Sequence, residues 1–234
     1  MTLDEKIAYL KETKRYGFED LVLLVEVLRS EKGCPWDREQ THGSIRKDLI
    51  EETYEVIEAI DTENAVLLQE ERGDLLFQIV FHSQIEEEKG TFCMDEVVND
   101  ICKKMIHRHP HVFGTVEVEN SREVLSNWEA IKTEEKQRNT LVERLKAIPP
   151  MLPALMRASK VSKKAGKTTG VSQEELLEKL ARDQQKLHQK AIDHETIGNL
   201  LLTVAQLAQL SEVDAEHALS DATDRLIAEV ERKN

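Results

Sequence analysis

The 234-residue sequence contains few of the residues that interrupt helices. It has 9 glycines, 5 prolines and 4% aromatic residues, while the helix-forming residues Leu, Ala, Glu, Lys and Gln recur along the whole chain. It also lacks an apolar run of membrane-spanning length, and its N-terminal segment has no apolar core of the signal-peptide type. We therefore expect an all-α protein that is cytoplasmic and does not act at a membrane.

An excess of positive charge is missing as well, because 45 acidic residues outnumber 32 basic ones and give a net charge of −13. This balance argues against a partner such as nucleic acid, which would require a basic stripe. The three cysteines, Cys34, Cys93 and Cys102, form no C-x-x-C pair. We interpret them as reduced cytosolic thiols.

Apolar residues at helical spacing predict a series of helices with short breaks between them. Residues 31–43 contain Gly33, Pro35 and Gly43 and are expected to form a loop, after which Ser44 is predicted to be a helix N-cap. The segment Asp61–Asn64 is predicted to be a tight turn. The expected helices in this half cover residues 18–30, 45–60, 65–90, 94–109 and 121–138.

A proline-rich segment at Pro149, Pro150 and Pro153 is predicted to link two halves, and the sequence after it is also helical in pattern. The second half contains an echo of the first, since "ERGDLLFQIVFHSQI" aligns with "TIGNLLLTVAQLAQL" and places Gly73 on Gly198. We interpret this as a degenerate duplication. The expected domains are residues 1–148 and 149–234, each a small helical bundle or part of one.

Clustered carboxylates are the most informative feature of the first half. Glu51, Glu52 and Glu55 form E-E-x-x-E on one predicted helix, and Glu71 and Asp74 form E-x-x-D on the next. Residues three or four apart share a helix face. Because a tight turn joins the two helices, they must run antiparallel, and at ~1.5 Å per residue the two motifs reach similar heights.

Such a cluster of acids requires compensation, because like charges raise one another's pKa. A divalent cation compensates best, and oxygen-only ligands favour Mg²⁺, with Mn²⁺ as the alternative. A di-iron bundle would use Glu-x-x-His, and no histidine stands at that spacing here. The competing interpretation is that these acids lie on an ordinary solvated helix face. Apolar neighbours such as Leu49 and Leu75 argue against it, because they indicate a packed surface beside the acids.

Four segments in order resemble the MazG family of nucleoside triphosphate pyrophosphohydrolases: "CPWDREQTH", "LIEETYEVIEAI", "ERGDLLFQIVFHSQI" and "KMIHRHPHVFG". The resemblance implies an all-α fold of MazG-like repeats, with four-helix bundles completed by dimerisation. It implies hydrolysis of nucleoside triphosphates to monophosphate and pyrophosphate with Mg²⁺. The metal ligands would then be Glu52, Glu55, Glu71 and Asp74. Glu51 and Glu52 are the catalytic candidates, and Glu51 would orient or deprotonate water.

Basic and aromatic residues are candidates for binding the substrate. Lys104 and Arg108 share a predicted helix face and, with Arg46 or Lys47, could contact phosphate, although cations at a helix C-terminus are common without a ligand. Trp36 could stack on a base or anchor its loop. A separate histidine group could bind a transition metal or form structural hydrogen bonds; it comprises His107, His109 and His111.

The second half departs from the acidic pattern. Thr196 and Asn199 stand where Glu71 and Asp74 align, and Arg182, Asp183 and Lys186 match the first motif. Arg182 and Lys186 are cationic and would repel a metal ion. We therefore expect this half to lack a metal site and to serve assembly or regulation. Homodimerisation, or higher homo-oligomerisation, is expected from the apolar stripes. Alternatives are a nucleotide-binding or protein-binding regulator without catalysis and a helical interaction protein.

Overall fold

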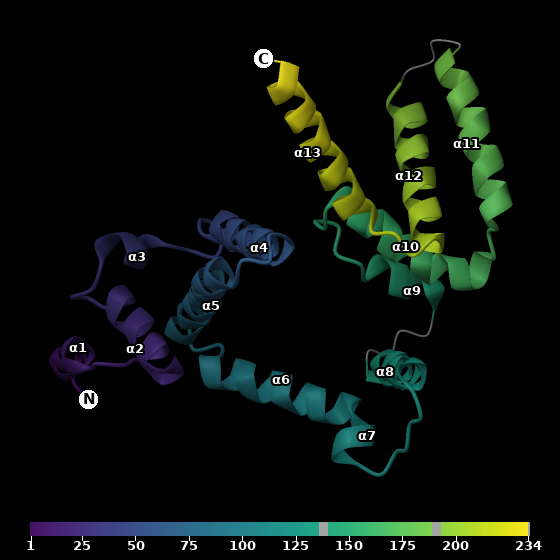
Figure 1. Ribbon diagram of the computed structural model, residues 1–234. Coiled ribbons are helices and arrows are strands. Elements are labelled where there is room, and N and C mark those ends of the chain that lie inside the picture. Colours follow the sequence, from purple (N-terminus) through teal and green to yellow (C-terminus); the bar gives the residue numbers. More distant parts are fainter. Residues whose placement is uncertain (136–139, 189–192, 234) are drawn as a thin grey trace. The chain divides into compact units, whose positions relative to one another are not determined.

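The computed structural model describes residues 1–135, 140–188 and 193–233, and these residues form helices joined by turns and loops without a strand (Figure 1). This confirms the all-α fold class. None of the described helices combines the length and the apolar character that crossing a membrane requires. In chain order the helices are α1 (Leu3–Glu12), α2 (Phe18–Arg29), α3 (Pro35–Glu39), α4 (Arg46–Asp61), α5 (Ala65–Glu88), α6 (Met94–Arg108), α7 (Pro110–Phe113), α8 (Ser121–Glu135), α9 (Leu141–Lys146), α10 (Ala154–Thr169), α11 (Gln173–His188), α12 (His194–Leu210) and α13 (Ala215–Lys233).

The segment before α4 differs from the sequence-based expectation in two ways. It contains the short helix α3, which Pro35 begins at a position where proline is favoured. Ser44 is not the N-cap of α4, because that position belongs to Ile45. The Ser44 hydroxyl instead donates to Gln40 Oε1 (2.8 Å) and accepts from the Thr41 N–H (2.9 Å), so it closes the preceding turn.

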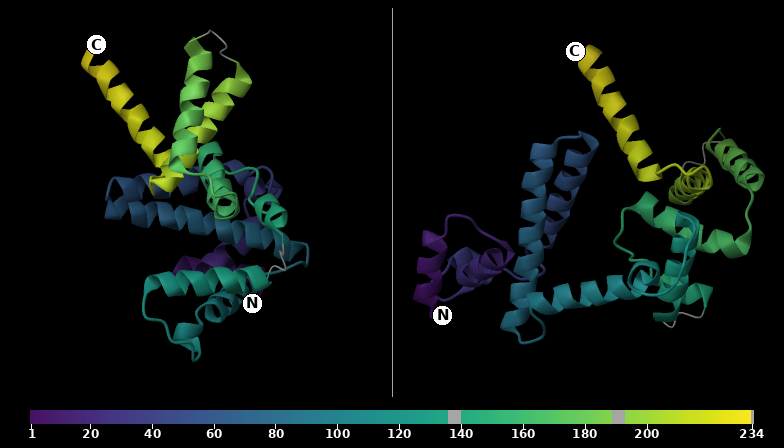
Figure 2. Two further views of the ribbon diagram at one scale, coloured as in Figure 1. Left: turned by 90° about the vertical axis from the view of Figure 1, so that its right-hand side faces the viewer. Right: turned by 60° about the horizontal axis from the view of Figure 1, so that its bottom comes forward.

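Helices α4 and α5 form the predicted antiparallel pair, and both views in Figure 2 show them side by side. The turn between them places Glu63 in the left-handed region, at φ 52°. Asn64 then caps α5, with its side-chain oxygen accepting from the N–H groups of Val66 and Leu67. At the other end of α5, Gly90 has φ 70°, a conformation that glycine adopts without strain.

The core of the N-terminal unit lies where α2 and the start of α6 meet the C-terminal half of α5. Val25, Val80 and Phe81 are at most 2% exposed, and Ile45 from the start of α4 joins them. Arg29 lies over the Phe81 ring, 5.1 Å from its centroid. The core thus includes the N-cap position of α4 but no residue of the helix itself.

Contacts divide the chain into two units, Met1–Val124 and Leu125–Asn234. The helix before the prolines, α9, packs on α10 of the second unit, and the division into repeats at residues 148 and 149 stays a prediction. In that unit α12 packs against α10, α11 and α13. In the sequence, the α11–α12 pair aligns with α4–α5 as the predicted duplication requires. The duplication itself stays a prediction.

Candidate metal centre

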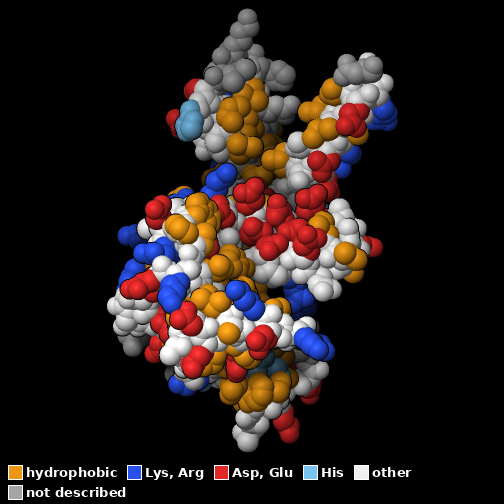
Figure 3. All heavy atoms as spheres, turned by 90° about the vertical axis from the view of Figure 1, so that its left-hand side faces the viewer, with side chains coloured by type: hydrophobic (Ala, Val, Ile, Leu, Met, Phe, Trp, Pro, Cys, Tyr) orange, Lys and Arg blue, Asp and Glu red, His pale blue; other side chains and the backbone are white. Residues whose placement is uncertain are grey.

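The α4–α5 pair brings the side chains of Glu52, Glu55 and Glu71 together. One carboxylate oxygen from each lies within 4.8 Å of the others, and no second group of three metal-binding side chains is this close among the described residues. All three side chains are half-buried. Figure 3 shows acidic side chains gathered in a dense patch at mid-height, where the α4–α5 pair lies.

The electrostatics of this cluster are those of carboxylates that lack a balancing charge. Burial raises the pKa of Glu52, and the charges of Asp74, Glu55 and Glu71 raise it further. Burial also raises the pKa of Glu71, followed by the charge of Glu55 and a hydrogen bond with it. Glu55 thus interacts with both neighbours, an arrangement that requires either a shared proton or a cation.

The remaining two acids of the sequence motifs lie at the edge of this group. Asp74 is exposed and lies outside the close group, although its charge acts on both Glu52 and Glu71. Glu51 is exposed on α4. The structure therefore joins three of the four predicted metal ligands closely and leaves the fourth within electrostatic range.

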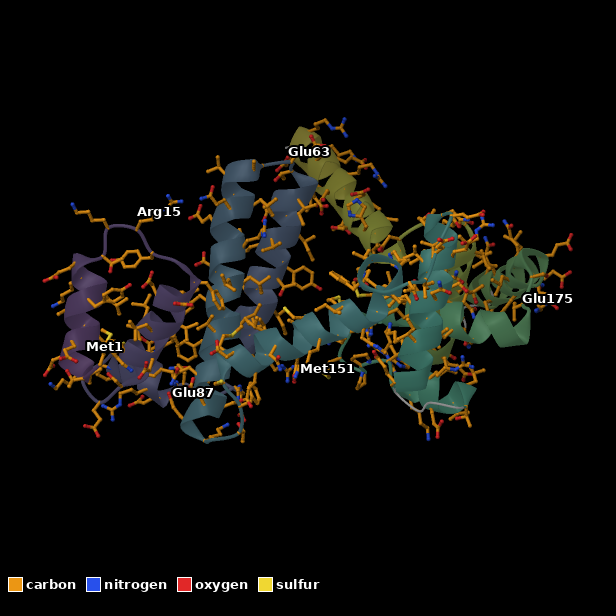
Figure 4. The ribbon with its side chains drawn as sticks, turned by 90° about the horizontal axis from the view of Figure 1, so that it is seen from below. Met1, Arg15, Glu63, Glu87, Met151 and Glu175 are labelled. Carbon is orange, nitrogen blue, oxygen red and sulfur yellow. The ribbon has the colours of Figure 1, made fainter. Side chains whose placement is uncertain are left out.

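The donor set fits a hard divalent cation. It consists of carboxylate oxygens alone, which suits Mg²⁺ or Mn²⁺ rather than a soft metal. The ligands lie on two rigid helices, and the tight turn labelled by Glu63 in Figure 4 fixes the helices at one end. Carboxylates from facing helices are a recurrent way to build a metal site in a bundle.

The predicted phosphate-binding residues differ in exposure. Arg46 and Lys47 are exposed in the first turn of α4, and Lys104 is exposed on α6. Arg108, one turn after Lys104 at the end of α6, is only 8% exposed, and its phosphate contact stays a prediction. Trp36 is 60% exposed on α3, which leaves its ring open to stacking and does not fit a loop anchor.

The three histidines around Pro110 show a structural interaction. His109 Nδ1 lies 2.6 Å from the carbonyl oxygen of Met105 and donates to it, while the rings of His109 and His111 are tilted against each other at 5.6 Å. A different histidine pair, His42 and His82, is hydrogen-bonded in this unit. Sequence reasoning missed it, because the two residues are 40 positions apart and form no motif.

Comparison with known proteins identifies the family. Residues 40–113 match the MazG nucleotide pyrophosphohydrolase domain. The chain is 40% identical over 221 residues to the nucleoside triphosphate pyrophosphohydrolase/pyrophosphatase MazG of Thermotoga maritima, covering 90% of this chain and 82% of that protein. The chain belongs to the MazG family.

Other MazG relatives show how far the similarity extends. The nucleoside triphosphate pyrophosphohydrolase of Escherichia coli K12 is 40% identical over 226 residues, which cover 91% of this chain and 86% of that protein. That of Mycolicibacterium smegmatis is 38% identical over 144 residues, or 61% of this chain and 44% of that protein. The MazG domain match contains the whole acid cluster together with Arg46, Lys47, Lys104 and Arg108, and Trp36 precedes it.

Proposed function

We propose that the protein is a nucleoside triphosphate pyrophosphohydrolase that converts NTP and water to NMP and pyrophosphate. The observation that carries the proposal is the convergence of Glu52, Glu55 and Glu71, with Asp74 beside them, in a chain whose relatives bear this name. We assign the role of clearing non-standard or surplus nucleotides from the cytoplasm. Acids held this close cost stability unless they bind a cation, so a purely structural role gives them no benefit.

The residues of α4 and α5 would hold Mg²⁺, or Mn²⁺, through Glu52, Glu55, Glu71 and Asp74. A bound cation of this type supplies positive charge for the phosphate oxygens and lowers the pKa of a coordinated water. The helix pair contributes positioning, because its carboxylates are already assembled before the ligand arrives. Glu51, adjacent to Glu52 on α4, is exposed to solvent and is assigned to orient or deprotonate the attacking water.

Exposed cations of the same unit would bind the remaining phosphate charge. Arg46 and Lys47 precede the acidic motif on the same helix, and Lys104 projects from α6. Lysine and arginine donate charge-assisted hydrogen bonds to phosphate. Trp36 is assigned to stack on the base, in keeping with its exposure.

The decisive experiment measures pyrophosphate and orthophosphate released from NTPs in the presence of Mg²⁺. We expect pyrophosphate alone, and we expect Glu52→Gln and Asp74→Ala each to reduce the rate by about 100-fold or more, since even outer partners of metal ligands contribute ~10–100-fold. Glu87→Gln is the matched control, because Glu87 is an exposed glutamate near the far end of α5 (Figure 4). Full activity in both cluster variants would refute the assignment.

We also propose that the protein acts as a homodimer or higher homo-oligomer. The α4–α5 pair exposes large apolar side chains, including Tyr54 (51%), Ile57 (41%), Ile60 (55%) and Ile79 (40%). Exposed apolar side chains of this density are typical of a contact surface. Light scattering on the purified protein should give a mass of two chains or more. The alternative of a regulator without catalysis predicts nucleotide binding with no pyrophosphate release.

A further inference from the structure

The end of the α4–α5 pair opposite the Glu63 turn contains a hydrogen-bonded group of three side chains, His42, His82 and Glu86, here called the histidine bridge. His42 Nδ1 lies 2.7 Å from His82 Nδ1, and His42 Nε2 lies 2.6 Å from Glu86 Oε1. The two imidazole rings are nearly parallel, with 9° between their planes and 5.0 Å between their centroids. Because His42 precedes α4 and the other two lie on α5, the histidine bridge joins the segment that leads into α4 to α5.

The distances define where the protons sit when the histidine bridge is neutral. Hydrogen bonds from Lys89, Thr91 and His42 lower the pKa of Glu86 to about 2, so Glu86 is ionised and accepts. His42 must then donate through Nε2–H and accept at Nδ1, which makes His82 Nδ1–H the second donor. This leaves His82 Nε2 without a proton. That atom is buried and has no hydrogen-bond partner among the described residues.

An additional proton on the histidine bridge creates an unsatisfied donor. Whichever ring becomes cationic, His82 Nε2 then carries an N–H that is buried with no acceptor. A second added proton would place two N–H groups face to face across 2.7 Å. In agreement, burial and the neighbouring His42 lower the pKa of His82 below its ordinary value of 6.5.

The charged groups around the histidine bridge nearly balance one another. Lys89 forms an ion pair with Glu86 on α5 (2.7 Å), and Arg29 of α2 pairs with Glu88 (2.7 Å). Arg38 and Glu39 line the cavity beside His42. With these charges offsetting one another, burial and then the neighbouring His42 lower the pKa of His82.

We propose that His42 is a positioning residue for the acid cluster, because the neutral histidine bridge holds the start of α4 against α5. Helix α4 is then fixed at both ends, by the Glu63 turn and by the histidine bridge, and Glu52 and Glu55 lie between these points. This inference rests on the proposed function for its effect on metal binding. Acid weakens the histidine bridge as the pH falls below about 6.5, the ordinary value for histidine.

The test compares His42→Gln and His82→Asn with the wild type. His42→Gln removes the ring that contacts both partners, whereas the amide of His82→Asn can still donate to His42 Nδ1 and does not titrate. Arg38→Ala is the control, since Arg38 is an exposed side chain lining the same cavity. The readouts are amide hydrogen exchange over residues 46–55 without metal and the dissociation constant for Mn²⁺.

At pH 7.5 we expect His42→Gln to speed exchange at the start of α4 and to weaken Mn²⁺ binding about tenfold, with kcat at saturating metal little changed. His82→Asn should match the wild type at pH 7.5 and keep a larger share of its affinity at pH 6. Unchanged exchange and affinity in His42→Gln would overturn the inference. If no variant and no wild-type sample binds Mn²⁺, the proposed function fails, and hydrogen exchange alone then decides the role of His42.

Discussion

The helix pairs α4–α5 and α11–α12, which the predicted duplication aligns, differ in the charges that they bring together. Aligned through Gly73 and Gly198, the fully buried Val80 (1% exposed) corresponds to Ala205 (0%). In α4–α5, three carboxylates converge, and the charges that raise the pKa values of Glu52 and Glu71 are those of other acids. In α11–α12, Lys186 stands at the position of Glu55, and its ammonium lies 2.9 Å from Asp183 Oδ1.

The second pair therefore contains its own counter-charge. The hydrogen bond and charge of Asp183 raise the pKa of Lys186, and the charges of Glu195 and Asp193 add to this effect. Asp183 is 4% exposed, and the position of Glu71 is taken by the buried and uncharged Thr196. The second pair thus neutralises its buried acid with a side chain, and we expect the first pair to take its cation from solution.

The largest effect on activity is expected when the α4–α5 cluster is given the internal lysine of the α11–α12 pair. Glu55→Lys places an ammonium beside Glu52 and Glu71, as Lys186 does beside Asp183. We expect the variant to fold, to take up no Mg²⁺ by calorimetry and to release pyrophosphate at least about 100-fold more slowly. Glu87→Lys makes the same charge change far along α5 and should leave activity intact. An active Glu55→Lys enzyme would show that the cluster is not the metal centre.

Metal binding should affect the two units unequally. At about 100 times its dissociation constant, a cation that binds only the folded state stabilises it by ~2.7 kcal/mol. We expect Mg²⁺ to slow amide hydrogen exchange across residues 46–88 and to leave residues 173–188 and 193–210 unchanged. Glu55→Lys should abolish the protection. Protection of α11–α12 in that variant would locate a metal site in the second unit, contrary to the comparison.

Removing the internal cation should destabilise the second unit. Lys186→Met leaves the Asp183 carboxylate buried without its partner, which is unfavourable for a desolvated charge. We expect the melting temperature of the C-terminal unit to fall by several degrees, while pyrophosphate release changes little. Arg182→Met is the matched control, because Arg182 pairs with Glu178 at 3.6 Å on the exposed face of the same helix. Equal shifts of the melting temperature in the two variants would show that Lys186 does not stabilise the unit by neutralising Asp183.

The sequence was sufficient for features that depend on residues close together in the chain. The α4–α5 hairpin follows from Asn64 and the spacing of apolar residues, and the acid cluster follows from two short motifs on that hairpin. The burial of Arg108 was not predictable, because a cation at a helix end is usually solvated. The bond between His42 and His82 depends on core packing that brings α5 against the start of α4, and no local pattern encodes that contact.

The smallest expected effect concerns two glycines that the predicted duplication aligns with each other. Gly73 and Gly198 are exposed in the interiors of α5 and α12, and a Cβ at either position would meet no described atom within 4 Å. Glycine in a helix interior costs about 0.5–1 kcal/mol relative to alanine. Gly73→Ala and Gly198→Ala should therefore each raise the unfolding free energy of its unit by roughly that amount in urea titrations.

A difference between the two variants would sharpen the comparison. Gly73 lies between Glu71 and Asp74, on a helix pair that exposes apolar side chains. Because glycine has no side chain, another backbone can approach the helix closely at this position. If Gly73→Ala lowers stability and the mass measured by light scattering while Gly198→Ala raises stability, a partner chain approaches α5 closely at the acid cluster. If both variants are stabilised, the surface at Gly73 is open, and a partner must contact the helix pair elsewhere.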